Sequence, residues 1–241
     1  MASPPDSFEH VARGLDAVRE RIARAARAAG RAPDAVRLIA VSKTMPGAAI
    51  RAAHAAGQRD FGENYAQELA GKLTELGDLP DLAWHFIGNL QRNKAKLVVG
   101  RACIHTLDGT ALADELERRA AAAGIARVDT LIEVNVGGEA QKSGVAPADL
   151  PTLLDALAGR PHLRVGGLMC IPPAATDPEA SRPHFRALAR LRDELSRTPR
   201  AGIDLGHLSM GMSVDLEAAI AEGATLVRVG TAIFGERRPR H

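Results

Sequence analysis

Short apolar runs recur along this chain of 241 residues, and alanine- and leucine-rich segments with helical spacing separate them. About eight such β-then-α units follow one another without a Pro/Gly-rich linker or a break in composition. This alternation predicts a parallel sheet covered by helices, and the length suits one large domain. We therefore expect a single closed (β/α)8 barrel over residues 1–241, with residues 1–7 and 236–241 as flexible termini. An open, doubly wound sheet is the alternative.

The expected strands are short and bounded by turn residues or by the start of a helical segment. They cover residues 37–43, 59–63, 84–88, 103–107, 130–136, 164–171, 204–210 and 225–230. The helical segments with the clearest periodicity cover residues 66–76, 111–123, 148–157, 184–195 and 216–222. Residues 8–30 predict an additional amphipathic helix before the first strand, with Leu15, Val18 and Ile22 on one face. We expect this helix to cover the bottom or the side of the barrel.

Charge and composition exclude several classes of partner. The formal net charge is +2, from 31 basic and 29 acidic residues, so no strong field favours nucleic acid or an anionic membrane. Aromatic residues make up only 3% of the chain, which leaves few platforms for stacking nucleic acid bases. The start of the chain lacks a secretory pattern, and Cys103 and Cys170 form no CxxC motif. We expect both to be buried, reduced thiols and the protein to be cytoplasmic, with no membrane association.

Lys43 is the first candidate for chemistry. It closes the apolar run Leu38-Ile39-Ala40-Val41-Ser42-Lys43, after which Thr44-Met45-Pro46 opens a helix-like segment. A lysine at the carboxyl end of a buried strand lies where α/β proteins hold their ligands. Desolvation there favours the neutral amine, which can form a Schiff base with an aldehyde. The alternative is a structural lysine that extends its charge into water from the end of a strand.

The last two predicted strands end in loops that suit a phosphate group. Ser209-Met210-Gly211-Met212-Ser213 follows the seventh strand, and Gly230-Thr231 follows the eighth. Glycine lets backbone N–H groups approach an anion, and a hydroxyl adds a further donor. In barrels the last two units commonly form the phosphate site, although such sequences also serve as ordinary turns and caps.

Arg228 precedes the second loop on the eighth strand and should point into the barrel on the same side as Gly230. A guanidinium inside a barrel needs an acceptor, and an ion pair with Glu133 on the fifth strand is one possibility. The other is donation to a ring nitrogen or an anion of a ligand. Pyridoxal 5′-phosphate (PLP) would use all three features, since it carries an aldehyde, a phosphate and a pyridine nitrogen.

The motifs taken together resemble one known family, the pyridoxal phosphate homeostasis proteins of the YggS/PROSC type. The resemblance runs from about Leu38 to Gly235, and it implies a barrel similar to the amino-terminal domain of alanine racemases. The motifs that carry it are Phe61-Gly62-Glu63-Asn64-Tyr65, His85-Phe86-Ile87-Gly88, Leu90-Gln91, Asn93-Lys94, Lys142-Ser143-Gly144, Gly167-Leu168-Met169, Ser209-Met210-Gly211-Met212-Ser213 and Arg228-Val229-Gly230-Thr231.

The resemblance also implies roles for individual residues. Lys43 would hold PLP as an internal aldimine, and Arg228 would face the pyridine nitrogen. Ser209, Gly230 and Thr231 would contact the phosphate. Three further positions match the motifs close to the site with less defined roles, and they are Asn64, Gly211 and Met212.

Racemisation needs a base on each face of the substrate, and this chain offers Lys43 with only one tyrosine, Tyr65. Arg228 opposite the ring nitrogen would also weaken the electron sink of the cofactor. We therefore expect a monomeric protein that binds, buffers and delivers PLP, with apo-enzymes that use PLP as recipients and without robust catalysis. A low-activity amino-acid racemase is the nearest alternative.

Two other enzyme classes share parts of this pattern. An aldolase-like barrel would use the same lysine and phosphate loops but needs an acid/base group beside them. A metal hydrolase could use His85, His105 and His207, but no HxH or HExxH spacing supports it, so no metal is expected.

Overall fold

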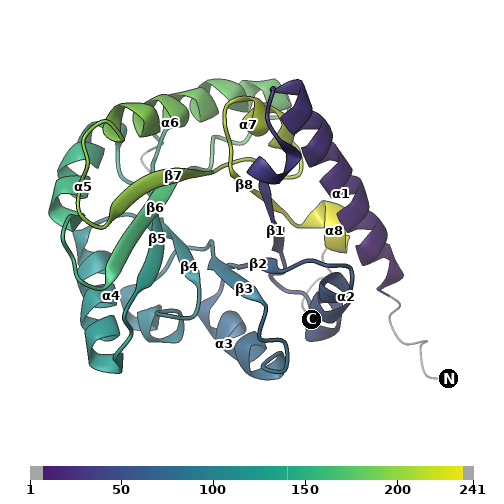
Figure 1. Cartoon of the computed structure of the whole chain (residues 1–241), viewed down its shortest axis with the longest axis horizontal. Coiled ribbons are helices and arrows are strands. Elements are labelled where there is room, and N and C mark those ends of the chain that lie inside the picture. The colour runs from purple at the N-terminus through teal and green to yellow at the C-terminus, as the bar shows by residue number, and fades with distance from the viewer. Residues whose placement is uncertain (1–7, 140, 236–241) are drawn as a thin grey trace.

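The chain folds into one closed barrel of parallel strands, and this excludes the open, doubly wound sheet. The computed structural model describes residues 8–139 and 141–235, and the termini predicted to be flexible, residues 1–7 and 236–241, lie outside them. Each strand pairs in parallel with the next, and β1 pairs with β8 to close the ring, placing Ile39 opposite Arg228. Figure 1 shows the ring of strands enclosed by helices. The strands are β1 (Arg37–Val41), β2 (Asp60–Glu63), β3 (Ala83–Phe86), β4 (Cys103–Leu107), β5 (Val128–Glu133), β6 (Leu163–Met169), β7 (Ile203–Ser209) and β8 (Leu226–Val229).

The helices follow the predicted segments. Between β3 and β4, where the sequence analysis named no helical segment, the described chain forms only a short 3₁₀ segment, η2 (Arg92–Leu97). The helices are α1 (Glu9–Ala28), α2 (Gly47–Ala55), α3 (Ala66–Glu75), α4 (Thr110–Ala123), α5 (Leu150–Leu157), α6 (Arg182–Leu195), α7 (Leu216–Ala221) and α8 (Thr231–Phe234), and the other 3₁₀ segments are η1 (Pro33–Ala35), η3 (Pro147–Asp149) and η4 (Pro178–Ser181).

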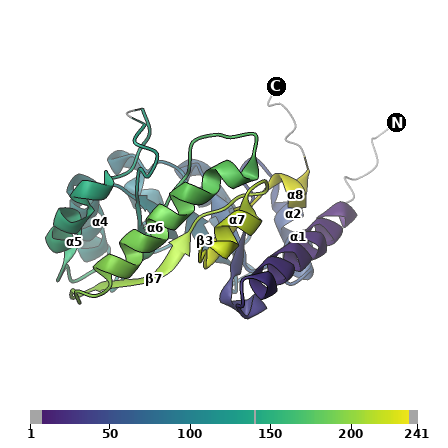
Figure 2. The ribbon, with the colours of Figure 1, turned by 90° about the horizontal axis from the view of Figure 1, so that it is seen from above.

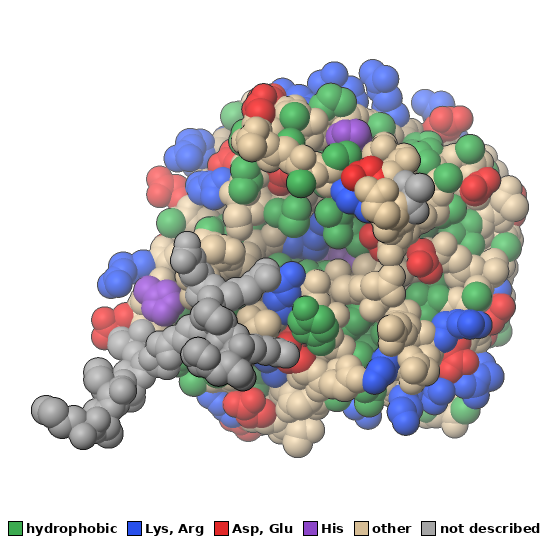
Figure 3. All heavy atoms as spheres, turned by 180° about the vertical axis from the view of Figure 1, so that it is seen from behind, with side chains coloured by type: hydrophobic (Ala, Val, Ile, Leu, Met, Phe, Trp, Pro, Cys, Tyr) green, Lys and Arg blue, Asp and Glu red, His purple; other side chains and the backbone are tan. Residues whose placement is uncertain are grey.

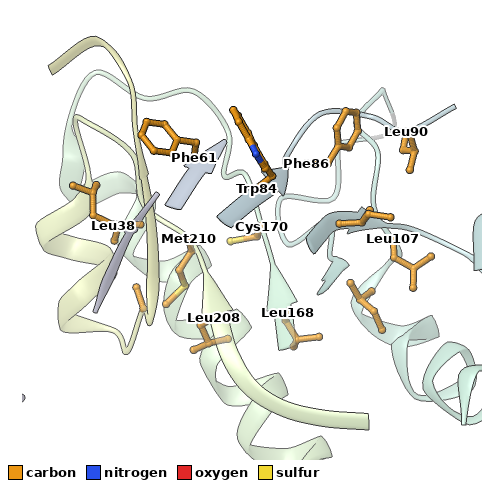
Figure 4. Packing of buried hydrophobic residues seen from close by; sticks show 14 of the residues in the cluster. Leu38, Phe61, Trp84, Phe86, Leu90, Leu107, Leu168, Cys170, Leu208 and Met210 are labelled. Atoms are coloured by element: carbon orange, nitrogen blue, oxygen red, sulfur yellow. The ribbon is translucent and has the colours of Figure 1, made fainter. Parts of the chain in front are cut away.

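Alternation along each strand divides the apolar side chains between two regions. Outward-facing residues pack against the helices in one extended core, which includes Phe61 and Trp84 with ring centroids 5.9 Å apart (Figure 4). A smaller cluster of Ile39, Leu131 and Leu226 lies on the inward face of the strands. Burying one such side chain contributes roughly 1.5–3 kcal/mol, so the outer core supplies most of the hydrophobic stabilisation.

Helix α1 covers the side of the barrel rather than its bottom. Its buried face includes the predicted Leu15, Val18 and Ile22 and packs on α2, α7 and α8 (Figures 1 and 2). The contact with α8 is close, because a Cβ on Gly14 would lie 2.8 Å from the carbonyl oxygen of Ala232. Glycine at this position therefore lets α1 approach the short helix that follows β8.

The surface agrees with the small net charge. Acidic and basic side chains are interspersed over the face in Figure 3, without a single-sign patch. In the part of the chain that the structure describes, no helix is long and apolar enough to cross a membrane. Cys103 and Cys170 are both free thiols, of which Cys170 is fully buried and Cys103 partly so.

Candidate functional site

A cavity of about 130 Å³ lies at the carboxyl ends of β1 and β8. It brings together five of the predicted residues, namely Lys43, Met212, Arg228, Gly230 and Thr231, and it adds Ser213. The remaining lining residues are Val41, Met45, Phe234 and Gly235, so an apolar wall faces a set of hydrogen-bond donors. No carboxylate, histidine or tyrosine lines this cavity within residues 8–139 and 141–235.

The backbone around Lys43 is fixed from both sides. The first strand was predicted to end at Lys43, but β1 ends at Val41, so Lys43 lies two residues beyond it. Before it, the carbonyl oxygen of Ser42 accepts a hydrogen bond from Lys72 Nζ at 2.7 Å. After it, Thr44 has φ +67° and donates its N–H to Glu68 Oε1 at 2.5 Å. A β-branched residue in this conformation costs on the order of 1–3 kcal/mol, which the surrounding contacts offset.

Those contacts form a buried ionic cluster next to Lys43. Lys72 Nζ lies 2.6 Å from Glu63 Oε1 and 2.8 Å from Glu68 Oε1, and the Ser42 hydroxyl donates to Glu63 at 2.6 Å. Burial raises the pKa of Glu63, while the attraction of Lys72 and hydrogen bonds from Lys72 and Ser42 oppose the rise. The sequence analysis missed this cluster, although the Glu68–Lys72 spacing of four residues on one helix is a recognisable signal.

Arg228 points into the barrel, as alternation predicted, but it does not pair with Glu133. Its Nη1 donates to Ser209 Oγ at 2.7 Å and its Nη2 donates to the Cys170 carbonyl at 3.0 Å. No ion pair joins Arg228 to Glu133 among the described residues. A guanidinium has five N–H donors, and only two are used by these bonds. Arg228 therefore retains donor capacity towards the cavity that it lines.

Arg228 and Glu133 influence each other's pKa although they form no ion pair. Complete burial lowers the pKa of Arg228, while Cys170, Glu133 and Asp215 act in the opposite direction. Burial raises the pKa of Glu133 to about 7, Asp108 adds to the rise, and Arg228 opposes it. The Glu133 carboxyl group consequently titrates near neutral pH.

A chain of hydrogen bonds leads from Arg228 through the barrel. Ser209 Oγ lies 2.9 Å from His105 Nδ1, His105 Nε2 lies 3.0 Å from His85 Nδ1, and His85 Nε2 lies 2.9 Å from Asp60 Oδ1. Arg228 can only donate, so every bond can point from Arg228 towards Asp60 with both histidines neutral. Burial lowers the pKa of His105 well below its usual range, which agrees with a neutral ring.

Three predicted residues do not line the cavity. Ser209 is fully buried beneath it, and its hydroxyl holds Arg228 and His105. Gly211 has φ +91°, and its carbonyl oxygen accepts a hydrogen bond from the backbone N–H of Arg228 at 3.0 Å. Glycine is therefore needed at this position for the backbone conformation. Asn64 follows β2, and its buried Oδ1 has no hydrogen-bond partner among the residues that the structure describes.

Helix α1 supports both loops at the cavity. Gly14 allows α1 to contact α8, which begins at Thr231. Arg21 donates to the Ser213 carbonyl at 3.0 Å and to both carboxylate oxygens of Glu217 at 2.8 and 2.9 Å. The helix predicted to cover the barrel therefore also positions the lining of the cavity.

Comparison with known proteins agrees with this geometry. The model of the alanine racemase N-terminal domain matches residues 14–238. The pyridoxal phosphate homeostasis protein of Aquifex aeolicus is 49% identical over 225 residues, covering 93% of this chain and 97% of the relative. That of Pseudomonas aeruginosa is 52% identical over 229 residues, covering 94% of this chain and 96% of the relative. PipY of Synechococcus elongatus, solved with PLP bound, is 40% identical with a TM-score of 0.81, covering 93% of this chain and 100% of PipY. The chain therefore belongs to the family of pyridoxal phosphate homeostasis proteins, which share the alanine racemase N-terminal domain fold.

Proposed function

We propose that this protein binds PLP in the cavity at Lys43 and serves the homeostasis of this cofactor by buffering and delivering it. The observation that carries the proposal is the donor set of one cavity, in which Lys43, Arg228 and two hydroxyl residues meet without a carboxylate. Such a set fits an aldehyde and an anionic phosphate on the same molecule. The names of the relatives and the PLP-bound PipY structure support the same ligand.

Each part of the cofactor has a partner in this arrangement. The Lys43 amine would hold the aldehyde as a Schiff base. Thr231, Gly230 and Met212 line the cavity and would surround the phosphate, and the remaining N–H donors of Arg228 would face the ring. When bound, the cofactor supplies an electron sink that can stabilise a carbanion. Arg228 limits that chemistry, because a permanent cation near the pyridine nitrogen disfavours its protonation.

We propose that Ser213 makes the phosphate contact that the sequence analysis assigned to Ser209. Ser213 lines the cavity, and its carbonyl is held by Arg21. Ser209 instead fixes the guanidinium of Arg228 from below. Both serines belong to the same motif, so the sequence alone offered no reason to prefer the later one. Asn64 and Gly211 lie outside the lining of the cavity, and a role for them in cofactor binding stays a prediction.

A carrier fits the cavity better than a racemase does. Among the described residues that line it, Lys43 is the sole side chain suited to accept a proton, and Tyr65 is 54% exposed and outside that lining. One base can remove an α-proton but cannot return it from the opposite face. We therefore propose a monomeric cytoplasmic carrier that passes PLP to apo-enzymes, with at most trace turnover. A low-activity racemase is the second candidate, since it would use the same cofactor site.

The experiment begins with Lys43→Ala and uses Lys96→Ala as the matched control on an exposed lysine. The parent protein and the control should show a cofactor absorption band that borohydride fixes to Lys43, as mapped by mass spectrometry. Lys43→Ala should lose the reducible adduct and keep its circular dichroism spectrum. An adduct of equal occupancy at another lysine in Lys43→Ala would refute the assignment.

Carrier and racemase are separated by two assays on the PLP-loaded protein. A carrier reactivates an apo-enzyme in stoichiometric proportion and leaves L- and D-amino acids unchanged. Racemisation at rates typical of enzymes, on the order of 10 per second, would establish the second candidate. Loss of that rate in Tyr65→Phe would then identify the second base.

A further inference from the structure

We propose that the opposite end of the barrel contains a binding site for a zinc-class divalent metal ion, formed by His85, Cys103 and His105. Cys103 is the first residue of β4, His105 lies in the middle of that strand, and His85 is the third residue of β3. None of the three residues lines the cavity at Lys43, although His105 is linked to Arg228 through Ser209.

Strand geometry brings the three side chains together. Cys103 and His105 are two residues apart on β4, so both point into the barrel. His85 on β3 pairs directly with Cys103 across the two strands. As a result, one potential ligand atom of each residue lies within 4.8 Å of the other two. Cys103 and His105 on β4, together with His85 on the neighbouring β3, therefore form a compact set of three potential metal ligands.

The distances and ligand types suit a tetrahedral ion. His85 Nδ1 and His105 Nε2 are 3.0 Å apart. Metal–nitrogen bonds of about 2.0–2.1 Å at the tetrahedral angle separate two nitrogens by roughly 3.3 Å, so a small adjustment suffices. Two imidazoles and a thiolate are ligands that favour Zn²⁺ over Mg²⁺ or Ca²⁺.

The outer nitrogen of each histidine is already held by an oxygen atom. His85 Nε2 bonds to Asp60 Oδ1 at 2.9 Å, and His105 Nδ1 bonds to Ser209 Oγ at 2.9 Å. Metal-ligating histidines usually have such a partner, which fixes the ring and directs its lone pair to the metal. The two inner nitrogens are hydrogen-bonded to each other at 3.0 Å, and a ligand atom of each histidine lies within 4.8 Å of Cys103 Sγ. Ligation by His105 Nε2 places its proton on Nδ1, and the Cys103 thiol releases its proton to solvent.

Access is provided by a second cavity, of about 220 Å³, which His85 and Cys103 line. Three arginines also line it, but each is paired with a carboxylate, so they do not create a repulsive field. The pairs are Arg37–Asp60 at 3.5 Å, Arg127–Asp129 at 2.5 Å and Arg164–Asp204 at 3.1 Å. The cavity leaves the fourth coordination position to water or to a small ligand, as in open zinc sites.

The test uses the tag-free full chain without PLP, since the cofactor itself binds metals, and Co²⁺ and Zn²⁺ alone as probes. Co²⁺ should bind with one equivalent and give the near-ultraviolet band of a cobalt–thiolate bond. Cys103→Ala should abolish this band and weaken Zn²⁺ binding by at least about tenfold in calorimetry. His85→Gln should weaken Zn²⁺ binding to a similar extent and keep a cobalt–sulfur band at high Co²⁺ concentration.

Two matched controls address other sites for the metal. Cys170→Ala removes the other thiol, and His207→Ala removes a histidine that lines the same cavity outside the cluster. Both should bind Zn²⁺ as the parent protein does. Absence of the cobalt–thiolate band in the parent, or unchanged Zn²⁺ affinity in Cys103→Ala, would show that the two histidines only hydrogen-bond each other. Loss of the band in Cys170→Ala would place the metal elsewhere.

Discussion

Replacement of Lys72 by methionine should destabilise the protein strongly, because it removes the cation from a buried cluster. Lys72 is 5% exposed and its partner Glu63 is 0% exposed. The ammonium group makes contacts of 2.6 to 2.8 Å with Glu63, Ser42 and Glu68. In Lys72→Met the Glu63 carboxylate keeps only the hydroxyl of Ser42 as a partner. Breaking a buried pair from one side costs about 3–5 kcal/mol, and we expect a loss of this size near pH 8.

The loss should depend on pH, with a sign that follows from Glu63. Burial already raises its pKa in the folded protein, so the folded state binds more protons than the unfolded state. Stability from such a group is fully present below the unfolded pKa and is lost as pH rises through the folded pKa. Removing Lys72 raises that pKa further. The destabilisation of Lys72→Met should therefore be smaller at pH 5 than at pH 8.

Urea unfolding of the parent and of Lys72→Met at both pH values measures the effect, provided that the m-values agree. The double variant Lys72→Met with Glu63→Gln should recover most of the loss, because a neutral amide still bonds to Ser42. Lys96→Met serves as the exposed control and should change stability by less than about 0.5 kcal/mol. A loss below about 1 kcal/mol in Lys72→Met, equal at both pH values, would refute the reasoning. PLP affinity should fall together with stability, since Ser42 directly precedes Lys43.

Three further predictions concern the packing of α1, the titration of Glu133 and the two serines. Gly14→Ala should destabilise the protein by about 1–3 kcal/mol and weaken PLP binding, because the added Cβ would meet the backbone of α8. The control Gly71→Ala, where the added Cβ would enter open space, should stabilise the protein by up to about 1 kcal/mol. Thermal unfolding measures both changes. Glu133 has a raised pKa of about 7, so parent stability should fall as pH rises from about 4.5 to 7, by on the order of 3 kcal/mol, and Glu133→Gln should flatten this dependence. A parallel pH profile in that variant would contradict the assignment. Ser209→Ala should cost about 1–3 kcal/mol of stability, because one buried N–H of Arg228 loses its acceptor. Ser213→Ala should instead reduce the preference for PLP over unphosphorylated pyridoxal in titrations. The reverse pattern would restore Ser209 as the phosphate contact.

The sequence by itself determined the barrel and half of the site. Strand-like runs alternating with helical segments permit few topologies, and parallel strands bring all their carboxyl ends to one edge. Lys43 and the pair Gly230 and Thr231 follow strands that close the ring side by side, so their positions along the chain were enough to bring them together. The amphipathic face of α1 could also be predicted from the sequence, because its apolar residues recur with the period of a helix.

The tertiary structure decided which side chains inside the barrel meet. The pairing of β4 with β5, β5 with β6 and β6 with β7 each contains a register shift. Such shifts change which residues are opposite each other, so alternation counted along one strand does not extend across the sheet. For this reason the sequence could not show that Arg228 bonds to Ser209 and the Cys170 carbonyl rather than to Glu133.

The same limit applies to the cluster at the other end of the barrel. Cys103 and His105 are visibly two residues apart, but the partner that completes the set, His85, is fixed by the pairing of β3 with β4. Local patterns encode the direction of a side chain relative to its own strand. Contacts between strands depend on register and on burial in the closed barrel, which arise only when the whole chain has folded.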